Sequence, residues 1–333
     1  MRAPLNLLTD IEGVAVGHAT DLNLGSGVTA VIFDRPVIAS GSVLGGAPGG
    51  RETALLDPSM TVDAVDAFVL SGGSAFGLDA AGGVQSGLRE IGRGFAVGSA
   101  RVPIVPQAIL MDLLNGGDKE WGLHPPYREM GYEAFLSAQT GLFELGTVGA
   151  GTGATTATVK GGIGSASAVT ASGHTVAVLM AVNAMGSATI GKGSHFWAAP
   201  FEANREFGGL GVPQDFDTAL RLKGITIPAT TIGVVVTDAV LTKAQAHRLS
   251  IAGHDGLARA VMPAHLPFDG DTIFSAATGA RPVADPAALM EIFHLAALVT
   301  ARAVARGIYE ATALPHAGAQ PAWRDRFSPA PKA

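Results

Sequence analysis

The segment PATTIGVVVTD, residues 228–238, contains a strong signal for a β-strand. From Thr231 to Asp238 it is rich in β-branched residues, which suit a largely buried strand. The strand follows a polar, glycine-containing loop, and Thr230 and Thr231 stand at its start. We therefore expect a core strand that begins with two hydroxyl side chains.

Around this strand, apolar segments of strand length alternate with amphipathic segments of helix length. The pattern predicts further strands at 65–70 and 175–183, and helices at 76–91, at 242–261 and from 286 or 287 to 311. Thr242 and Gln245 have the spacing of a capping box. The alternation is typical of a layered architecture that mixes α and β structure.

Composition excludes several classes of protein. Glycine accounts for 45 of 333 residues, without a three-residue period, so a collagen is excluded and closely packed layers are favoured. The net charge of −6 without a basic block offers no field to recruit nucleic acid or anionic lipid. The absence of cysteine excludes disulfides, thiolate zinc sites and a cysteine nucleophile.

The same composition bears on location and partners. Residues 1–6 lack the build of a signal peptide, and no uninterrupted apolar run reaches the roughly 18 residues of a membrane helix. We expect a cytoplasmic protein without a membrane or nucleic-acid partner.

No change of composition marks a linker between domains. Residues 113–132 and 208–226 are predicted to be loops, and the proline-rich stretch from Pro315 an extended tail. The chain, 1–333, is therefore expected to form a single domain.

Common cofactor and metal motifs are missing. The glycine-rich stretch 149–153 lacks the spacing of a dinucleotide fingerprint. His247 and His254, seven residues apart, are better explained as a structural pair than as metal ligands, since no third ligand stands at a recognisable spacing. No cofactor and no metal are expected.

Four groups of residues remain as candidates for chemistry. Thr230 and Thr231 offer hydroxyls, although threonines also begin strands simply because they are β-branched. Asp269 and Asp271 flank a glycine, either as an ordinary turn or as paired carboxylates that hold an ammonium or relay a proton.

Lys160 is one of few charges in a long neutral stretch, so it is either a surface residue of a glycine turn or a buried lysine with a lowered pKa. Asn183 ends an apolar strand, where its side chain is either a turn residue or a donor to a developing oxyanion.

Taken in order, short motifs over nearly the whole chain resemble the self-processing peptidases of the L-aminopeptidase/D-amidase type, which include β-aminopeptidases and nylon-oligomer hydrolases. Each motif is weak alone, and the ordered series carries the resemblance. The motifs are LTDIEG (8–13), VGH (16–18), GGAPG (45–49), RET (51–53), SGGSAFGL (71–78), VPIVP (102–106), VGAGTGA (148–154), KGG (160–162), VNA (182–184), TTIG (230–233), TDA (237–239), ARA (258–260) and FDGDTIF (268–274).

The resemblance implies an α+β fold, a four-layer αββα sandwich, and a precursor that cuts its own backbone before a serine or threonine. The matching bond joins Ala229 to Thr230, giving a large chain 1–229 and a small chain 230–333. The freed α-amine, with a pKa of about 7.7–8.0, then serves as general base for the hydroxyl of Thr230.

The other site residues are carried over from the same family. Asn183 matches the oxyanion donor, Asp269 and Asp271 match residues that orient the nucleophile and its amine, and Lys160 matches a lysine that favours the deprotonated nucleophile. Gly73 and Ser74 match substrate-binding positions. The implied activity is hydrolysis of short peptides or amides with a small amine-bearing residue, by a tetramer of processed units.

Two positions depart from the family pattern. Ala229 replaces the asparagine or glycine of most relatives, and residues 105–112 contain no aromatic side chain, so that segment supplies no phenol to the site. Because Ala-Thr is the scissile pair of ornithine acetyltransferases, an acyltransferase of that type is one alternative. An unprocessed, non-catalytic binding protein is the other.

Overall fold

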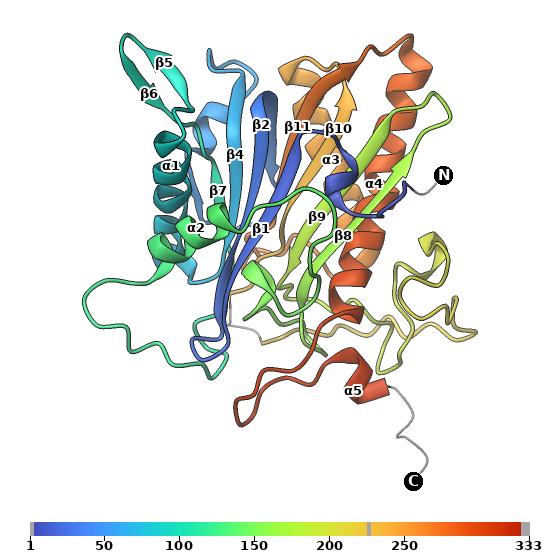
Figure 1. Cartoon of the computed structure of the whole chain (residues 1–333). Coiled ribbons are helices and arrows are strands. Elements are labelled where there is room, and N and C mark those ends of the chain that lie inside the picture. Colours follow the sequence, from blue (N-terminus) through green and yellow to red (C-terminus); the bar gives the residue numbers. More distant parts are fainter. Residues whose placement is uncertain (1–2, 225–227, 328–333) are drawn as a thin grey trace.

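The structure is a computed structural model that describes residues 3–224 and 228–327. Nine of its strands join one mixed sheet, in the order β3-β7-β4-β2-β11-β10-β9-β8 with β1 beside β2 (Figure 1). Those strands are β1 (Val14–Asp21), β2 (Ser26–Val43), β3 (Gly50–Arg51), β4 (Ala64–Ser71), β7 (Gln107–Ile109), β8 (Gly162–Val169), β9 (Thr175–Val182), β10 (Ile232–Ala239) and β11 (Thr272–Arg281). A separate hairpin pairs β5 (Phe95–Val97) with β6 (Ala100–Val102).

The long strand β2 belongs to two halves of the sheet. Its first half pairs with β1 and β4, and its second half, from Ile38 to Val43, pairs with β11. The two halves face each other, since Phe68 of β4 stacks on Phe274 of β11 with ring centroids 4.7 Å apart. Neighbours two strands apart in a flat sheet lie much farther from each other, because adjacent strands are about 4.8 Å apart.

Helices cover the outer faces of both halves. Figure 1 shows α1 and α2 on one side and α3 and α4 on the other. Their bounds are α1 (Ala80–Glu90), α2 (Tyr127–Leu136), α3 (Lys243–Ala260) and α4 (Pro286–Tyr309). A short helix, α5 (Trp323–Phe327), and five 3-10 turns complete the elements: Leu8–Asp10, Thr53–Leu56, Ser74–Asp79, Gly149–Gly151 and Ala199–Phe201.

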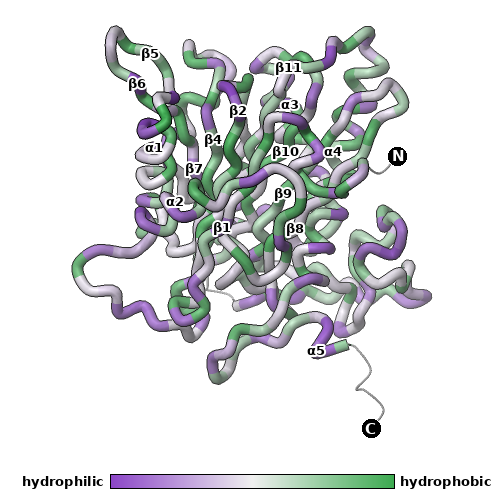
Figure 2. The backbone as a smooth tube through the Cα atoms, viewed as in Figure 1, coloured by the Kyte–Doolittle hydropathy of each residue, from purple (hydrophilic) through white to green (hydrophobic). Residues whose placement is uncertain are grey.

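Three hydrophobic cores separate these four layers. In β9 the side chains alternate, so that Val178 and Met180 face α3 and α4 while Leu179 and Ala181 face the opposite half of the sheet. A third core lies between β4 and helices α1 and α2. Figure 2 shows hydrophobic residues concentrated along these elements. The prediction of an α+β, four-layer αββα sandwich is confirmed.

The predicted elements are found with some changes of boundary. The capping box of α3 is confirmed, because Gln245 N donates to Thr242 Oγ1 and Thr242 N donates to Gln245 Oε1 at 2.8 Å. The predicted helix at 76–91 begins as a 3-10 turn, and the helix expected to end near residue 311 ends at Tyr309.

Two loop predictions are partly wrong. The predicted loop 113–132 contains the start of α2, whose Tyr127 and Met130 pack into the core beside α1. The predicted extended tail contains α5, whose Trp323 stacks on Phe196. Both helices are short, and buried aromatic contacts stabilise them, rather than a long amphipathic pattern in their own sequence. Of the predicted loop 208–226, residues 225–226 lie outside the described part, and so do Pro329 and Pro331 of the tail.

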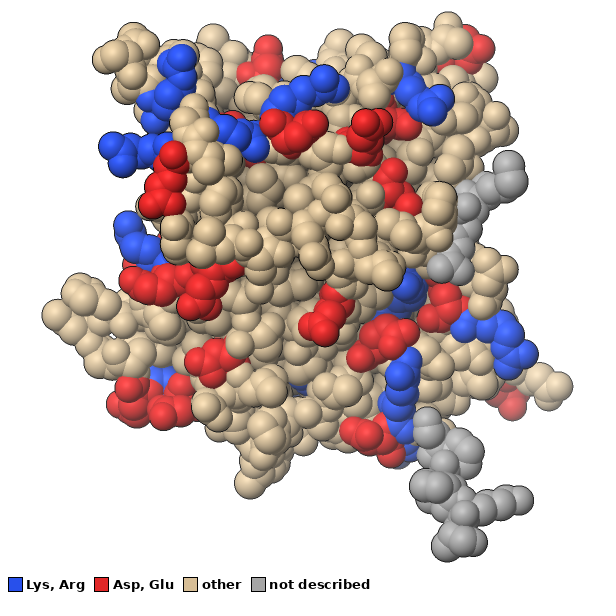
Figure 3. Space-filling view, in the orientation of Figure 1, with Lys and Arg blue, Asp and Glu red and all other residues tan. Residues whose placement is uncertain are grey.

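Helix α4 is the one helix of the described residues that is long and apolar enough, by length and composition alone, to cross a membrane. It packs against α3, β8 and β9, and a little over half of its most apolar stretch is buried, as in the core helix of a globular protein. On the face seen in Figure 3, acidic and basic side chains are interspersed, without a broad basic area.

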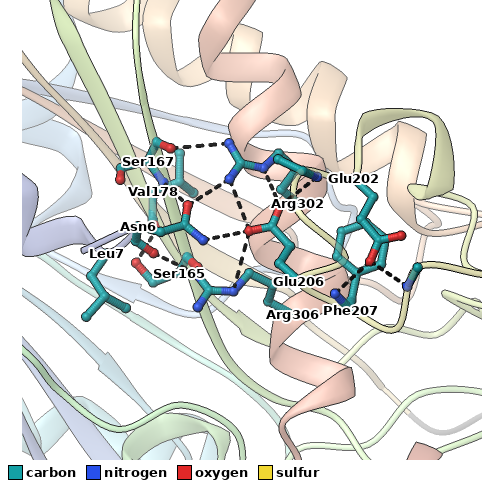
Figure 4. A network of polar contacts seen from close by, with 12 residues as sticks. Asn6, Leu7, Ser165, Ser167, Val178, Glu202, Glu206, Phe207, Arg302 and Arg306 are labelled. Atoms are coloured by element: carbon teal, nitrogen blue, oxygen red, sulfur yellow. Dashed lines mark hydrogen bonds and ion pairs between the residues drawn. The ribbon is translucent and has the colours of Figure 1, made fainter. Parts of the chain in front are cut away.

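A buried polar network joins the segment around Glu206 to this helix and to the N-terminal residues (Figure 4). Glu206 pairs with Arg302 at 2.5 Å and accepts a hydrogen bond from Asn6 Nδ2 at 2.6 Å. Arg306 lies on the other side of the same carboxylate and donates to Asn6 O at 2.6 Å. The loop that leads toward residue 229 is thereby fixed at its upstream end.

Candidate active site

The Ala229–Thr230 bond lies buried immediately before β10. Ala229 runs parallel to Asp269, with Ala229 N donating to Phe268 O at 3.1 Å and Gly270 N donating to Ala229 O at 2.9 Å. The Thr230 hydroxyl also donates to Ala229 O, at 2.5 Å, and Thr230 N donates to Asn183 O at 2.9 Å. The carbonyl of the expected scissile bond thus receives two hydrogen bonds.

Glycine is required at position 270 because the hydroxyl of Thr230 approaches it so closely. A Cβ at Gly270 would lie 2.7 Å from Thr230 Oγ1 and 2.6 Å from Ala47 O. A side chain there would displace either the hydroxyl or the neighbouring backbone. The DGD sequence therefore brings its two carboxylates to this site around a residue without a side chain.

Asn183 follows β9, and its carboxamide is hydrogen-bonded through both its oxygen and its nitrogen. Its Oδ1 accepts hydrogen bonds from Thr155 N at 3.0 Å and from Lys223 Nζ at 2.7 Å, and its Nδ2 donates to Met111 O at 3.0 Å. An ammonium carries only donors, so Lys223 selects the oxygen and fixes which way the amide faces. The carboxamide is thus held in a single orientation beside the backbone of Thr230.

The two aspartates differ in how their oxygens are paired. Asp271 accepts from Thr231 N at 2.9 Å and from His265 N and Nδ1 at 3.0 and 2.8 Å. Asp269 accepts from Met185 N at 3.1 Å through Oδ1, while its buried Oδ2 has no partner among the described residues. Burial, together with the charge of Asp271, raises the pKa of Asp269 to about 6.

Lys160 lies a little apart from these residues. It is buried, and its Nζ donates to Gly151 O and Gly161 O, each at 2.8 Å, while no hydrogen bond joins it to Thr230 in the described part of the chain. Burial lowers the pKa of Lys160 to about 7, with a smaller contribution from the charge of Lys223. Lys160 and Lys223 both line a cavity of about 340 Å³.

Gly73 connects to this cavity through Asp112, whereas Ser74 does not. Gly73 N donates to Asp112 Oδ1 at 2.7 Å, and Ser74 N donates to Leu110 O at 3.0 Å. Asp112 lines the cavity, whereas Gly73 and Ser74 do not. Gly73 has a φ of 84° and packs against the ring of Tyr127, so a side chain does not fit there.

The structure thus places Thr230, Asn183, Asp269 and Asp271 together and Lys160 at the neighbouring cavity. Sequence reasoning missed Lys223, Asp112 and His265. Lys223 stands in a segment predicted only as a loop, and Asp112 ends the strand-like run VPQAILMD, where its carboxylate was a signal that could have been used. His265 adopts a φ of 56°, which no sequence pattern indicated.

A metal centre finds no support in the described residues, where no group of three or more histidine, aspartate or glutamate side chains is placed to hold an ion. His247 Nδ1 lies 3.0 Å from Gly41 O and His254 Nε2 lies 3.0 Å from Ser42 O. Both histidines therefore attach α3 to β2.

Comparison with known proteins gives the family to which the chain belongs. Residues 6–320 match the model of peptidase family S58, and the chain belongs to that family. Its relatives include proteins named as uncharacterised aminopeptidases of Mycobacterium tuberculosis, 42% identical over 97% of this chain and 98% of theirs, and of Mycobacterium leprae, 41% identical over 84% of this chain and 80% of theirs.

Solved structures share the fold. A β-aminopeptidase of Burkholderia sp. superposes with a TM-score of 0.72 at 22% identity, over 98% of this chain and 92% of that one. The L-aminopeptidase D-Ala-esterase/amidase of Ochrobactrum anthropi, described as a variant of the Ntn-hydrolase fold, gives 0.71 at 19% identity, over 98% and 91%. The predicted family resemblance is confirmed, and a peptidase or amidase that acts on a peptide or amide substrate follows from it.

Proposed function

We propose that the chain is a self-cleaving amidohydrolase or aminopeptidase with an N-terminal threonine nucleophile, which acts on short peptides or amides that carry a small amine-bearing residue. The observation that supports this most strongly is the buried Ala229–Thr230 bond, whose carbonyl accepts hydrogen bonds from Gly270 N and from the hydroxyl of Thr230.

In the precursor, Thr230 Oγ1 attacks the carbonyl carbon of Ala229. The C–N bond breaks, the proton of the hydroxyl passes to Thr230 N, and an ester remains. Gly270 N, already donating to this carbonyl oxygen, stabilises the negative charge that develops on it. Asp269 is a suitable proton acceptor, since its carboxyl is buried, has an unpaired oxygen and titrates near neutrality.

Water then opens the ester and leaves a carboxylate on Ala229 and a free amine and hydroxyl on Thr230. The amine lies beside Asn183 O, to which Thr230 N already donates. Once neutral, this amine takes the proton of its own hydroxyl while that oxygen attacks the substrate carbonyl. Asn183 is proposed as the oxyanion donor of this second reaction, through the second N–H of Nδ2, since the first donates to Met111 O.

Intact-mass measurement of the purified protein tests cleavage and its position together. We expect fragments of residues 1–229 and 230–333 from the wild type, and one uncut chain from Thr230→Ala. Thr231→Ala is the matched control, because it removes the adjacent buried hydroxyl and should be cut normally. A wild type that stays in one piece yet hydrolyses amides would exclude this mechanism.

A panel of L-Ala, D-Ala and β-Ala amides then tests hydrolysis by the cut protein. Acetyl transfer from N-acetylornithine to glutamate, in place of hydrolysis, would assign the acyltransferase alternative. Absence of any reaction with an intact chain would assign the binding-protein alternative. The tetramer of processed units and the cytoplasmic location stay predictions.

A further inference from the structure

The cavity beside Asn183 is lined by two lysines whose N–H donors are not all hydrogen-bonded to the described residues. Its volume of about 340 Å³ is at the small end of the range of about 300–1,000 Å³ that is usual for small-molecule sites. Three charged side chains of buried or nearly buried residues line it, namely Asp112, Lys160 and Lys223.

Among the described residues, Lys160 and Lys223 each leave one N–H donor without a partner. An ammonium has three N–H donors. Lys160 uses two, on Gly151 O and Gly161 O, and Lys223 uses two, on Thr155 O and Asn183 Oδ1. Lys243, buried elsewhere, donates to the carbonyls of Leu55, Met60 and Val62 and so uses all three.

The one carboxylate of the cavity is already occupied. Asp112 Oδ1 accepts from Gly73 N at 2.7 Å, and Oδ2 accepts from Ser26 Oγ at 2.7 Å. It lies close enough to oppose the lowering of both lysine pKa values, yet burial still brings the pKa of Lys223 and that of Lys160 to about 7. When both lysines are protonated, the single carboxylate of Asp112 leaves one positive charge of the cavity without a counter-charge, which a second anion can supply.

We propose that this cavity binds the carboxylate of a short peptide substrate through the third N–H donors of Lys160 and Lys223. The inference rests on the proposed function and names its substrate class: peptides of two or three residues that end in a free carboxylate, in preference to amides. A carboxylate has two oxygens to accept from two ammonium groups, and the small cavity has space for a short peptide only.

The position of the cavity agrees with this length. Lys223 Nζ is 2.7 Å from Asn183 Oδ1, and the backbone carbonyl of Asn183 is 2.9 Å from Thr230 N. One residue therefore separates the carboxylate site from the nucleophile. A carboxylate of an acidic side chain offers the same chemistry, so the experiment must distinguish the two sources.

Binding to the uncut Thr230→Ala chain tests the site without turnover. We would measure calorimetrically the binding of three peptides: Ala-Ala, Ala-Ala amide, and Ala-Glu amide, whose only carboxylate is on its side chain. Because hydrogen bonds to charged groups are the stronger ones, we expect Ala-Ala to bind at least about tenfold more tightly than its amide. Equal binding of Ala-Ala and its amide overturns the proposal, and tight binding of Ala-Glu amide alone transfers the site to an acidic side chain.

Variants in the same background identify the residues. Lys223→Met should bring the ratio between acid and amide to about one, whereas Lys223→Arg should keep a preference for the acid. Lys243→Met is the matched control, since it removes a buried lysine whose donors are all paired, and it should leave the ratio unchanged. A ratio that survives in Lys223→Met contradicts the proposal. If that variant does not fold, the peptide comparison on the Thr230→Ala chain still decides.

Turnover separates this proposal from the proposed function. If the processed enzyme hydrolyses peptide acids and amides with the same kcat/KM, the carboxylate site is wrong and the hydrolase stands. If it hydrolyses neither while the uncut chain prefers the acid in the binding experiment, the proposed function is wrong and the site stands.

Discussion

Asp269 has a raised pKa because of burial and the charge of Asp271. Asp271 has both oxygens paired, whereas Asp269 has a buried oxygen without a partner among the described residues. An ionised carboxylate in that position lacks both solvent and a full set of donors, so the neutral form is favoured. Two aspartates only two residues apart therefore differ in their hydrogen bonding.

The stability of the uncut chain should depend on pH through Asp269. Because its pKa is about 6 in the folded protein and about 3.9 in an unfolded chain, the folded state holds the extra proton between those values. The free energy of unfolding should then fall as pH rises from about 4 to 6, and Asp269→Asn should remove this part of the dependence. Urea unfolding of Thr230→Ala and of Thr230→Ala/Asp269→Asn across this range measures it. A difference between the two that does not vary with pH would contradict the assignment.

Asn183 should be essential for rate. Replacing it with alanine removes the proposed oxyanion donor, and such a loss typically lowers kcat by about 10²- to 10³-fold. The measurement is kcat on the best amide of the panel, with protein whose cleavage has first been confirmed by mass. Asn204→Ala, in an exposed loop remote from the site, is the control and should keep the wild-type rate. An unchanged kcat in Asn183→Ala would show that another donor serves the oxyanion.

Sequence motifs were enough to select the residues around Thr230, because the family resemblance assigns Asn183, Asp269 and Asp271 by short patterns. Lys223 could not be selected in this way. Its importance depends on an ammonium reaching Asn183 Oδ1 from a loop without regular structure, which is a three-dimensional property. The pairing of His265 with Asp271 is likewise a matter of backbone conformation.

Among the elements, a buried ion pair attaches the loop around Glu206 to α4. Glu206 and Arg302 have side chains only 4% and 6% exposed. Glu206→Gln leaves Arg302 buried without its counter-charge, and breaking such a pair typically costs about 3–5 kcal/mol. We expect a loss of that order in the free energy of unfolding by urea.

The half-exposed pair of Arg324 and Glu310 provides the comparison for this loss. Glu310→Gln should change the free energy of unfolding by at most about 1 kcal/mol. Similar losses in the two variants would mean that burial does not govern the strength of the Glu206 pair.

Long elements with a regular hydrophobic pattern were predictable from the sequence, whereas the short helices were not. The local sequence predicts α3 through its apolar stripe and capping box. It predicts β10 through its run of β-branched residues. The short helices α2 and α5 form where Tyr127 and Trp323 find buried aromatic or apolar surfaces, and those surfaces come from distant parts of the chain. No local pattern contains that information.

The order of the strands determines how the two chains of the proposed processed protein would hold together. Residues 230–333 supply β10 and β11, which lie between β9 and β2 of residues 1–229. Hydrogen bonds join the two chains on both sides of this pair. After cleavage, the fragments should therefore elute together in native size-exclusion chromatography and separate only in denaturant. Separate elution of native fragments would be incompatible with this sheet.

The central place of β10 and β11 has a consequence for recovery from denaturation. The uncut polypeptide can refold in a unimolecular reaction, whereas the cut protein must first associate two separate fragments in solution. Refolding of the cut protein should thus become slower on dilution, as expected for any assembly step. Cleavage of the Ala229–Thr230 bond would therefore make refolding of the mature enzyme depend on protein concentration, whereas folding of the precursor would not.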